Sequence, residues 1–174
     1  MLCDVGLGYE HIDVSKYDFS LFYGEYSADQ VCHICGTSQY VRKKIPHKRL
    51  RYFPITPCQK RLYSSKKTAT AMRWHKEGRV VEPGVLRHLA DGEAWQHFDS
   101  LNEQFASDPR SIRLGLASDG FNPFGNMSTS YIMWHVVLIS YNFPPWKITA
   151  KTNYLLSLLI PGPKSLTKDF DVFM

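Results

Sequence analysis

The chain has 174 residues, of which 44% are hydrophobic and 14% aromatic; this composition excludes an intrinsically disordered protein and suffices for one sizeable core or two small ones. The formal net charge of +5 favours an acidic partner such as nucleic acid. No signal peptide is visible at the N-terminus, and no stretch of about 20 apolar residues is available to span a membrane, so no membrane partner is predicted.

Charge and composition divide the chain into segments. Residues 42–79 contain thirteen Lys and Arg residues against one acid, whereas only five basic and three acidic residues follow Arg110. The part after Arg110 is rich in apolar and β-branched residues. We therefore predict a cysteine-containing segment over residues 1–45, a basic region of helices and loops over residues 46–109, and a β-rich segment over residues 110–174.

The first segment contains a C-x-x-C-G motif with Cys32 and Cys35. Two thiolates at this spacing can share one Zn²⁺ because a tight turn points both sulfurs inward, and the following glycine permits the left-handed turn. A structural zinc site needs four ligands, and Cys3, His11 and His33 are the candidates for the other half. The alternative interpretation is a turn that carries two reduced cysteines.

The basic stretch of residues 42–79, which begins at the end of the first segment, interleaves cations with aromatic residues. This pattern can neutralise phosphates and stack on bases or sugars, so it predicts DNA as a partner. The residues that carry the prediction are Arg42, Lys43, Lys44, Lys48, Arg49, Arg51, Lys60 and Arg61. The alternative is a solvated basic surface whose aromatic residues turn into a small core. Apolar residues at helical spacing predict helices over residues 64–76 and 92–104.

The third segment is typical of a β meander. Alternating and β-branched residues predict strands over residues 111–118, 131–141 and 154–160, and the first turn of a helix is expected at residues 168–173. Asp119 is expected at the exposed end of the first strand, beside Gly120, where a carboxylate suits a hard cation such as Mg²⁺. The alternative is that Asp119 begins a turn, a position that favours Asp in any protein.

A series of longer motifs resembles one protein family. The longest is LGLASDGFNPFGNMSTSY at residues 114–131, followed by YNFPPW at residues 141–146 and LSLLIPGPKS at residues 156–165. Upstream, LRYFP (50–54), MRWH (72–75), RHLAD (87–91) and FASDPR (105–110) resemble the same family in the same order. Together these motifs resemble the Tnp2-type transposases of plant CACTA (En/Spm) elements.

The resemblance implies a fold and a chemistry. The family is similar to DDE/D recombinases, whose catalytic domain resembles ribonuclease H and begins with three antiparallel strands. The implied fold is α+β: an incomplete ribonuclease H-like domain of three antiparallel strands and the start of a helix, preceded by a basic, loop-rich region with short helices and a degraded zinc-knuckle-like motif. The resemblance also implies that Asp119 is the first catalytic acid, that it binds Mg²⁺ for attack on a DNA phosphodiester, and that the protein acts in the nucleus.

Two departures from the family pattern bear on function. The family places two further cysteines before the C-x-x-C motif, at positions that align with Ser15 and Phe19 here, which implies a degraded Zn²⁺ site. The later catalytic acids are expected beyond Met174, because Asp169 and Asp171 align with the opening of the connecting helix. The expected function is a transposase fragment that is inactive by itself. The alternatives are a non-catalytic DNA-binding or interaction module, and a degenerate transposon reading frame.

Overall fold

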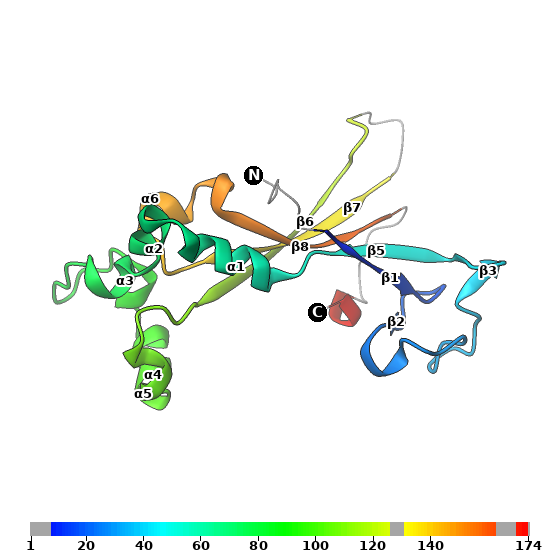
Figure 1. Ribbon diagram of the computed structural model, residues 1–174, viewed down its shortest axis with the longest axis horizontal. Helices are drawn as coiled ribbons and strands as arrows, with labels where there is room; N and C mark the ends of the chain where they lie inside the picture. The colour runs from blue at the N-terminus through cyan, green and yellow to red at the C-terminus, as the bar shows by residue number, and fades with distance from the viewer. Residues whose placement is uncertain (1–7, 126–130, 163–169, 174) are drawn as a thin grey trace. The chain divides into compact units, whose positions relative to one another are not determined.

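The computed structural model describes residues 8–125, 131–162 and 170–173, which form two compact units (Figure 1). The helical unit contains residues 55–117 and 138–155, and the β unit contains the remaining described residues. Three strands continue from one unit into the other: β6 (Leu114–Phe121), β7 (Met133–Ser140) and β8 (Tyr154–Ile160).

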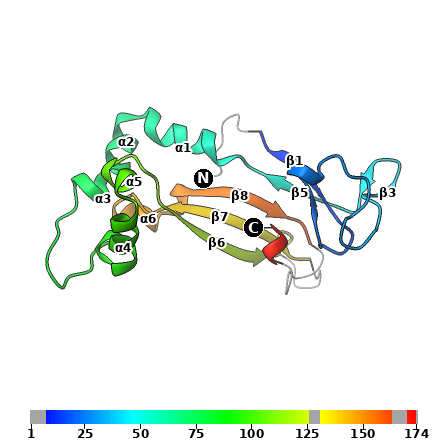
Figure 2. The same ribbon diagram turned by 90° about the horizontal axis from the view of Figure 1, so that it is seen from below.

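A six-stranded sheet has the strand order β2–β1–β5–β8–β7–β6 (Figure 2). Its N-terminal strands are β1 (Glu10–Val14), β2 (Leu21–Phe22) and β5 (Lys48–Tyr52). β1 pairs antiparallel with β2 and with β5, and β5 pairs antiparallel with β8, where Arg51 lies opposite Leu159. A separate two-stranded ribbon consists of β3 (Tyr40–Arg42) and β4 (Ile45–Pro46). The combination of helices with antiparallel strands confirms the α+β prediction.

The C-terminal strands largely follow the sequence prediction. β8 has the predicted bounds, and β7 lies within the predicted range of residues 131–141. β6 begins three residues later than predicted and extends to Phe121, so Asp119 lies inside the strand and does not begin a turn. Gly120 leaves room for this arrangement, because a Cβ there would lie only 3.1 Å from the side chains of Ile132 and Trp134.

The core of the β unit lies on one face of the sheet. Alternate residues of β1, β5 and β8 point to this face, as the two-residue repeat of a strand requires. The buried side chains are Ile12, Val14, Leu50, Ile160 and Phe173, and the partly buried Trp134, Leu158 and Val172 pack against them. The last two residues of η4 (Phe170–Phe173), a 3₁₀-helix at the expected position of a helix start, thus cover the core face. Residues 168 and 169 of that predicted turn lie outside the described residues.

The helical unit consists of short helices. Its α-helices are α1 (Ile55–Ser64), α2 (Lys66–Met72), α3 (Trp74–Glu77), α4 (Glu93–Leu101), α5 (Glu103–Ser107) and α6 (Pro145–Ile148). The 3₁₀-helices η2 (Leu89–Asp91) and η3 (Lys151–Asn153) accompany them, and η1 (Gly24–Tyr26) belongs to the β unit. None of the helices in the described ranges is long and apolar enough to cross a membrane.

Both predicted helices are interrupted. The helix predicted over residues 64–76 breaks at Ser65, which has an extended backbone, and again at Arg73. The helix predicted over residues 92–104 breaks at Asn102, whose φ of −130° and ψ of 57° are not helical. The sequence pattern also missed α1, because Pro57 suggests a chain break. Pro57 lies in the first turn of the helix, where a missing N–H group is tolerated.

Candidate functional site

Asp119 lies on β6, at one edge of the six-stranded sheet. Side chains alternate between the two faces of a strand, and Gly120, the next residue, lies beside the Trp134 side chain, which packs against the core. Asp119 therefore points to the face opposite the core. It is exposed to solvent on that side.

The neighbours of Asp119 on this face include aromatic rings. Phe121 and His135 are in edge-to-face contact, with ring centroids 5.5 Å apart, and His135 Nδ1 is buried without a hydrogen-bond partner in the described parts of the chain. The described residues contain no group of three His, Cys, Asp or Glu side chains that could hold a metal ion. Asp119 can offer a hard carboxylate oxygen to Mg²⁺, but as one ligand of a larger set.

The C-x-x-C segment forms a tight turn. Gly36 has a φ of +67° and donates its N–H to the Cys32 carbonyl at 2.9 Å, and the Cys32 N–H donates to the Thr37 carbonyl at 2.9 Å. Cys32 is 2% exposed, and its sulfur lies 3.1 Å from the Ser20 hydroxyl. The Cys35 sulfur lies 3.0 Å from the Thr37 hydroxyl. The turn thus places both thiols among hydrogen-bonding groups.

The Cys32 thiol is acidified by these groups. Burial raises its pKa, but hydrogen bonds from the Ser20 hydroxyl, from the backbone of Cys35 and Ile34 and from the Cys35 side chain outweigh burial and lower the pKa to about 6. Lowering of this kind favours the thiolate, which is the form that binds metal ions.

Ser15, at one of the two missing cysteine positions, is connected to Cys32 through Ser20. The Ser15 hydroxyl accepts hydrogen bonds from the N–H groups of Phe19 (2.9 Å) and Ser20 (3.1 Å), and Ser20 in turn contacts Cys32. Ser15 is fully buried, whereas Phe19 is exposed. Ser15 therefore has a structural role in the turn between β1 and β2.

The other ligand candidates have different surroundings. The His33 ring stacks on Tyr26 with centroids 4.1 Å apart, and His11 lies on β1 in edge contact with Tyr9. Cys3 lies outside the described residues.

We expect purified protein to contain well under one equivalent of zinc. Ser15 uses its hydroxyl to accept two backbone N–H groups, and Phe19 has no donor atom, so two of the four ligands that a structural site needs are missing. Elemental analysis of the purified chain measures this. Stoichiometric zinc that disappears in Cys32→Ser but persists in Cys58→Ser would show that other side chains complete the site.

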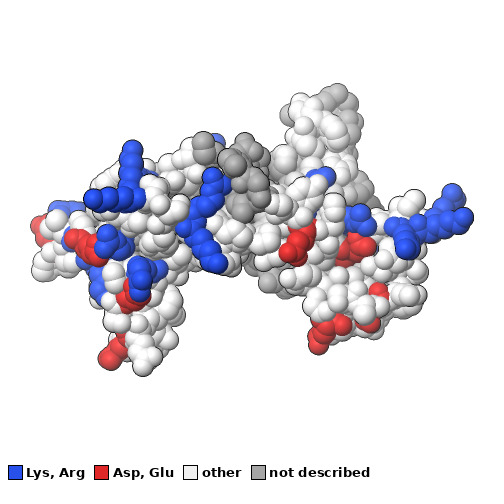
Figure 3. Space-filling model, viewed as in Figure 1, with Lys and Arg blue, Asp and Glu red and all other residues white. Residues whose placement is uncertain are grey.

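Three of the predicted nucleic-acid contacts lie at the tip of the β3–β4 hairpin. Arg42, Lys43 and Lys44 are all exposed, and Lys44 has a φ of 68° in the connecting turn. Figure 3 shows their region as a blue projection at the end of the hairpin. The flanking Val41 and Ile45 are more than half exposed. No ion pair to these three cations occurs within the described residues, so their charges are available to a polyanion.

The remaining predicted contacts have varied surroundings. Lys48 forms an ion pair with Asp18 at 2.9 Å, and Arg49 forms one with Asp13 at 2.7 Å, so acids compensate both charges. Arg51 is exposed. Lys60 and Arg61 are exposed on α1, in the helical unit. The predicted residues therefore belong to two units: Lys60 and Arg61 to the helical unit, and the other six to the β unit.

An aromatic cluster surrounds Arg113 in the helical unit, and no sequence pattern predicted it. The guanidinium carbon lies 4.3 Å from the centroid of a Trp95 ring, 5.1 Å from Phe105 and 5.8 Å from Phe98, and the guanidinium forms an ion pair with Asp99. The Arg113 side chain is 11% exposed. Such stacking of a desolvated guanidinium on aromatic faces stabilises the fold.

Two buried histidines pack against this cluster. His75 and His88 each have a ring contact with Trp95, at 5.7 Å and 5.9 Å. Burial, followed by the positive charge of Arg113, lowers the pKa of His75 to about 4, and burial also lowers the pKa of His88. His88 Nδ1 accepts the Ala90 N–H at 3.0 Å, so its Nε2 carries the proton and donates to the Phe143 carbonyl at 3.0 Å. Both rings are neutral at pH 7 and have structural roles.

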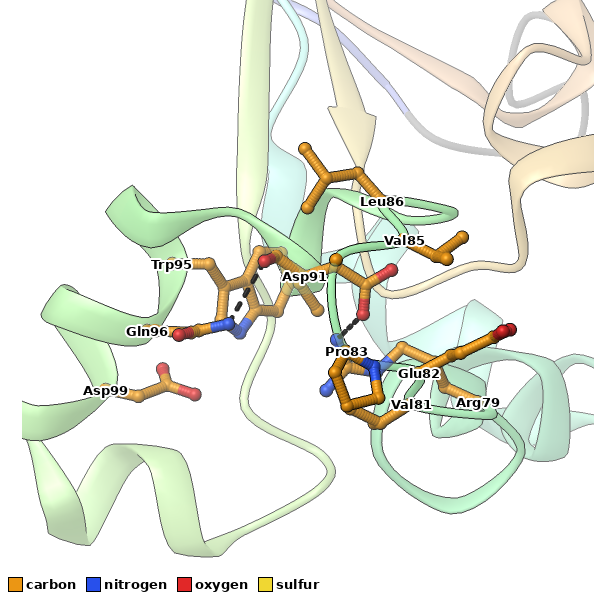
Figure 4. A pocket seen from close by; sticks show the side chains of 12 residues that line it. Arg79, Val81, Glu82, Pro83, Val85, Leu86, Asp91, Trp95, Gln96 and Asp99 are labelled. Atoms are coloured by element: carbon orange, nitrogen blue, oxygen red, sulfur yellow. Dashed lines mark hydrogen bonds and ion pairs between the residues drawn. The ribbon is translucent and has the colours of Figure 1, made fainter.

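A pocket of about 440 Å³ opens beside this cluster (Figure 4). Asp91 lies at its wall, where its carboxylate accepts hydrogen bonds from the N–H groups of Arg87 (2.9 Å) and His88 (2.8 Å) and pairs with Arg79. Burial alone would raise the pKa of Asp91, but these partners lower it. The Gln96 amide donates to the Asp91 carbonyl at 3.0 Å. The polar groups of the pocket wall already form hydrogen bonds and an ion pair with one another, so we assign them a structural role.

Comparison with known proteins gives one match. A family model described as transposase family tnp2 matches residues 83–174, slightly more than half of the chain. The matched range includes β6, β7 and β8 with Asp119. Neither the curated proteins nor the solved structures contain a match to the chain.

Proposed function

Because the chain belongs to the transposase family tnp2, we propose that it is a fragment of a DNA transposase of the plant CACTA (En/Spm) class, which works on DNA in the nucleus. The observation that supports this best is the exposed Asp119 on the first of three consecutive antiparallel strands, inside the matched range. That order of elements agrees with the start of a ribonuclease H-like domain, which is part of the proposal.

Asp119 would hold Mg²⁺ in this proposal. Its carboxylate is exposed and makes no hydrogen bond or ion pair with the described residues, so its oxygens are available to a hard cation. When bound, such a metal supplies activation of a water or of a 3′-hydroxyl for attack on a phosphodiester. Two-metal chemistry needs several converging carboxylates, so Asp119 alone does not complete the site.

A localised cleavage experiment tests the metal site. Fe²⁺ replaces Mg²⁺ at carboxylate sites and, with ascorbate and peroxide, cuts the polypeptide near its ligands. We expect fragments that end close to residue 119, suppressed by excess Mg²⁺ and absent from Asp119→Asn. Glu25→Gln, which removes an exposed carboxylate elsewhere in the β unit, is the control and should leave the pattern unchanged. A pattern insensitive to Asp119→Asn would refute the assignment.

The same preparation should neither nick nor join DNA with Mg²⁺ or Mn²⁺, because one carboxylate cannot position two divalent ions. Conversion of supercoiled plasmid to open circles measures this. Metal-dependent nicking by the unaltered chain that is lost in Asp119→Ala would contradict the proposed inactivity and would mean that further acids of the site lie within these 174 residues.

A second candidate function is a non-catalytic DNA-binding module. The observation that favours it is the exposed hairpin tip with Arg42, Lys43 and Lys44, whose charges have no partner among the described residues. It differs from the first candidate in needing no metal, so DNA binding that is unchanged by EDTA, together with a failed cleavage experiment, would favour it.

A further inference from the structure

The strands of the β unit distribute their side chains between two faces. On β5, Leu50 points into the core, so its neighbours Arg49 and Arg51 point to the opposite face. The pairing supports this, because Arg51 lies opposite Leu159, and the neighbours of Leu159 on β8, Leu158 and Ile160, belong to the core. Arg51 therefore projects from the face that does not carry the core, which we call the outer face.

Asp119 projects from the same outer face. Trp134 is on the core side of β7 and Gly120 lies beside it on β6, so Asp119, Phe121 and His135 are on the outer side. β5 and β6 belong to one continuous sheet, with β8 and β7 between them. β5 and β6 are therefore three strand spacings apart, which amounts to about 14 Å. This separation is less than the width of a nucleic-acid duplex, and it corresponds to about four base-pair steps of 3.4 Å.

The chemistry of the outer face around Arg51 suits a nucleic acid. The Arg51 guanidinium lies 5.5 Å from the centroid of the Tyr9 ring, which is 46% exposed and is in contact with the rings of His11 and Phe53. Asp13 compensates the charge of Arg49, whereas no acid pairs with Arg51 in the described residues. An exposed guanidinium held on an aromatic platform can bind a phosphate while the rings contact sugars or bases.

We propose that the outer face of the sheet is the surface on which a DNA duplex lies, with Arg51 on β5 and Tyr9, which directly precedes β1, binding its backbone so that the same duplex crosses Asp119 on β6. The proposal rests on DNA being the partner, as in the proposed function. It assigns the N-terminal strands a role that lies outside the segment matched by the family model: they extend the sheet beside β8 and supply the phosphate contact.

The test uses the full chain and a fluorescein-labelled 20-base-pair duplex in EDTA, with fluorescence anisotropy as the readout. Arg51→Gln should weaken binding roughly fivefold and reduce the slope of log affinity against log salt by about 1. Lys48→Gln is the matched control, because Lys48 lies on the same strand and is paired with Asp18. Its affinity should change less than about twofold. Circular dichroism confirms that each variant is folded.

The variant Asp119→Asn provides an independent test of the proposal. A carboxylate under the duplex repels it when no metal is present, so this variant should bind more tightly in EDTA, whereas Glu25→Gln should not. Equal losses of affinity in Arg51→Gln and Lys48→Gln, or no gain of affinity in Asp119→Asn, would show that the duplex does not lie on the outer face. The chain would still bind DNA in that case. If the unaltered chain does not bind the duplex at low salt, the DNA partner itself is wrong, and the proposed function fails with it.

Discussion

Replacing Arg113 with alanine is expected to lower the free energy of unfolding of the helical unit by about 3 kcal/mol. The substitution removes stacking on Trp95, Phe98 and Phe105 and leaves Asp99 without its cation. The loss is large because the guanidinium is only 11% exposed and therefore desolvated. Urea unfolding followed by tryptophan fluorescence measures it, since Trp74, Trp95 and Trp146 all belong to this unit.

Two further variants test whether the loss of stability in Arg113→Ala comes from the aromatic cluster. Arg110→Ala removes an exposed arginine that is paired with Asp108 nearby in sequence, and such surface pairs contribute little to stability because solvent screens them. Arg113→Lys keeps the charge but loses the planar group, so it should fall between the wild type and Arg113→Ala. Equal unfolding curves for Arg110→Ala and Arg113→Ala would mean that the cluster does not stabilise the unit.

The affinity for duplex DNA is expected to fall about a hundredfold between 50 and 200 mM salt. Arg42, Lys43, Lys44 and Arg51 are exposed and have no ion-pair partner among the described residues, so they can contact about four phosphates and give a slope of about −3.6 for log affinity against log salt. Anisotropy titrations across a salt series measure the slope. Binding that is absent at low salt, or that does not depend on salt, would mean that the basic residues only form a solvated surface.

The structure also predicts which cations determine the salt dependence of DNA binding. Replacing the three hairpin cations with alanine should reduce the magnitude of the slope by about 3, whereas the double variant Lys48→Ala, Arg49→Ala should change it by less than 1 because Asp18 and Asp13 compensate those charges. A larger change in the double variant than in the hairpin variant would contradict this ranking.

The sequence alone predicts the C-terminal strands well and the N-terminal ones poorly, for a physical reason. β8 is a continuous apolar run that ends at Pro161, and both signals are local. β5 reads K-R-L-R-Y, which contains one core residue, Leu50, among cations and resembles a solvated loop. It becomes a strand through its pairing with β1 and with β8, and the β8 partner lies more than a hundred residues away. Local patterns contain no information about such a partner.

In the candidate sites, too, local features could be predicted from the sequence and long-range contacts could not. The left-handed turn at Gly36 follows from the C-x-x-C-G motif alone, and the exposure of Asp119 follows from strand alternation. The surroundings of Arg113 could not be predicted, because Trp95 and Phe98 come from α4, Phe105 comes from α5 and Arg113 itself precedes β6. Likewise, the neutralisation of Lys48 by Asp18 requires a side-chain contact across thirty residues.

The pairing of β5 with β8 has a consequence for the order of folding. Arg51 and Tyr52 meet Leu159 and Leu158, and the core that encloses Leu50 includes Ile160 and Phe173. During synthesis the first fifty residues therefore emerge long before their partners, and closing so large a loop is slow. Until residue 160 is available, Ile12, Val14 and Leu50 have an incomplete core, and the nascent chain exposes an apolar strand edge that chaperones bind and that favours aggregation.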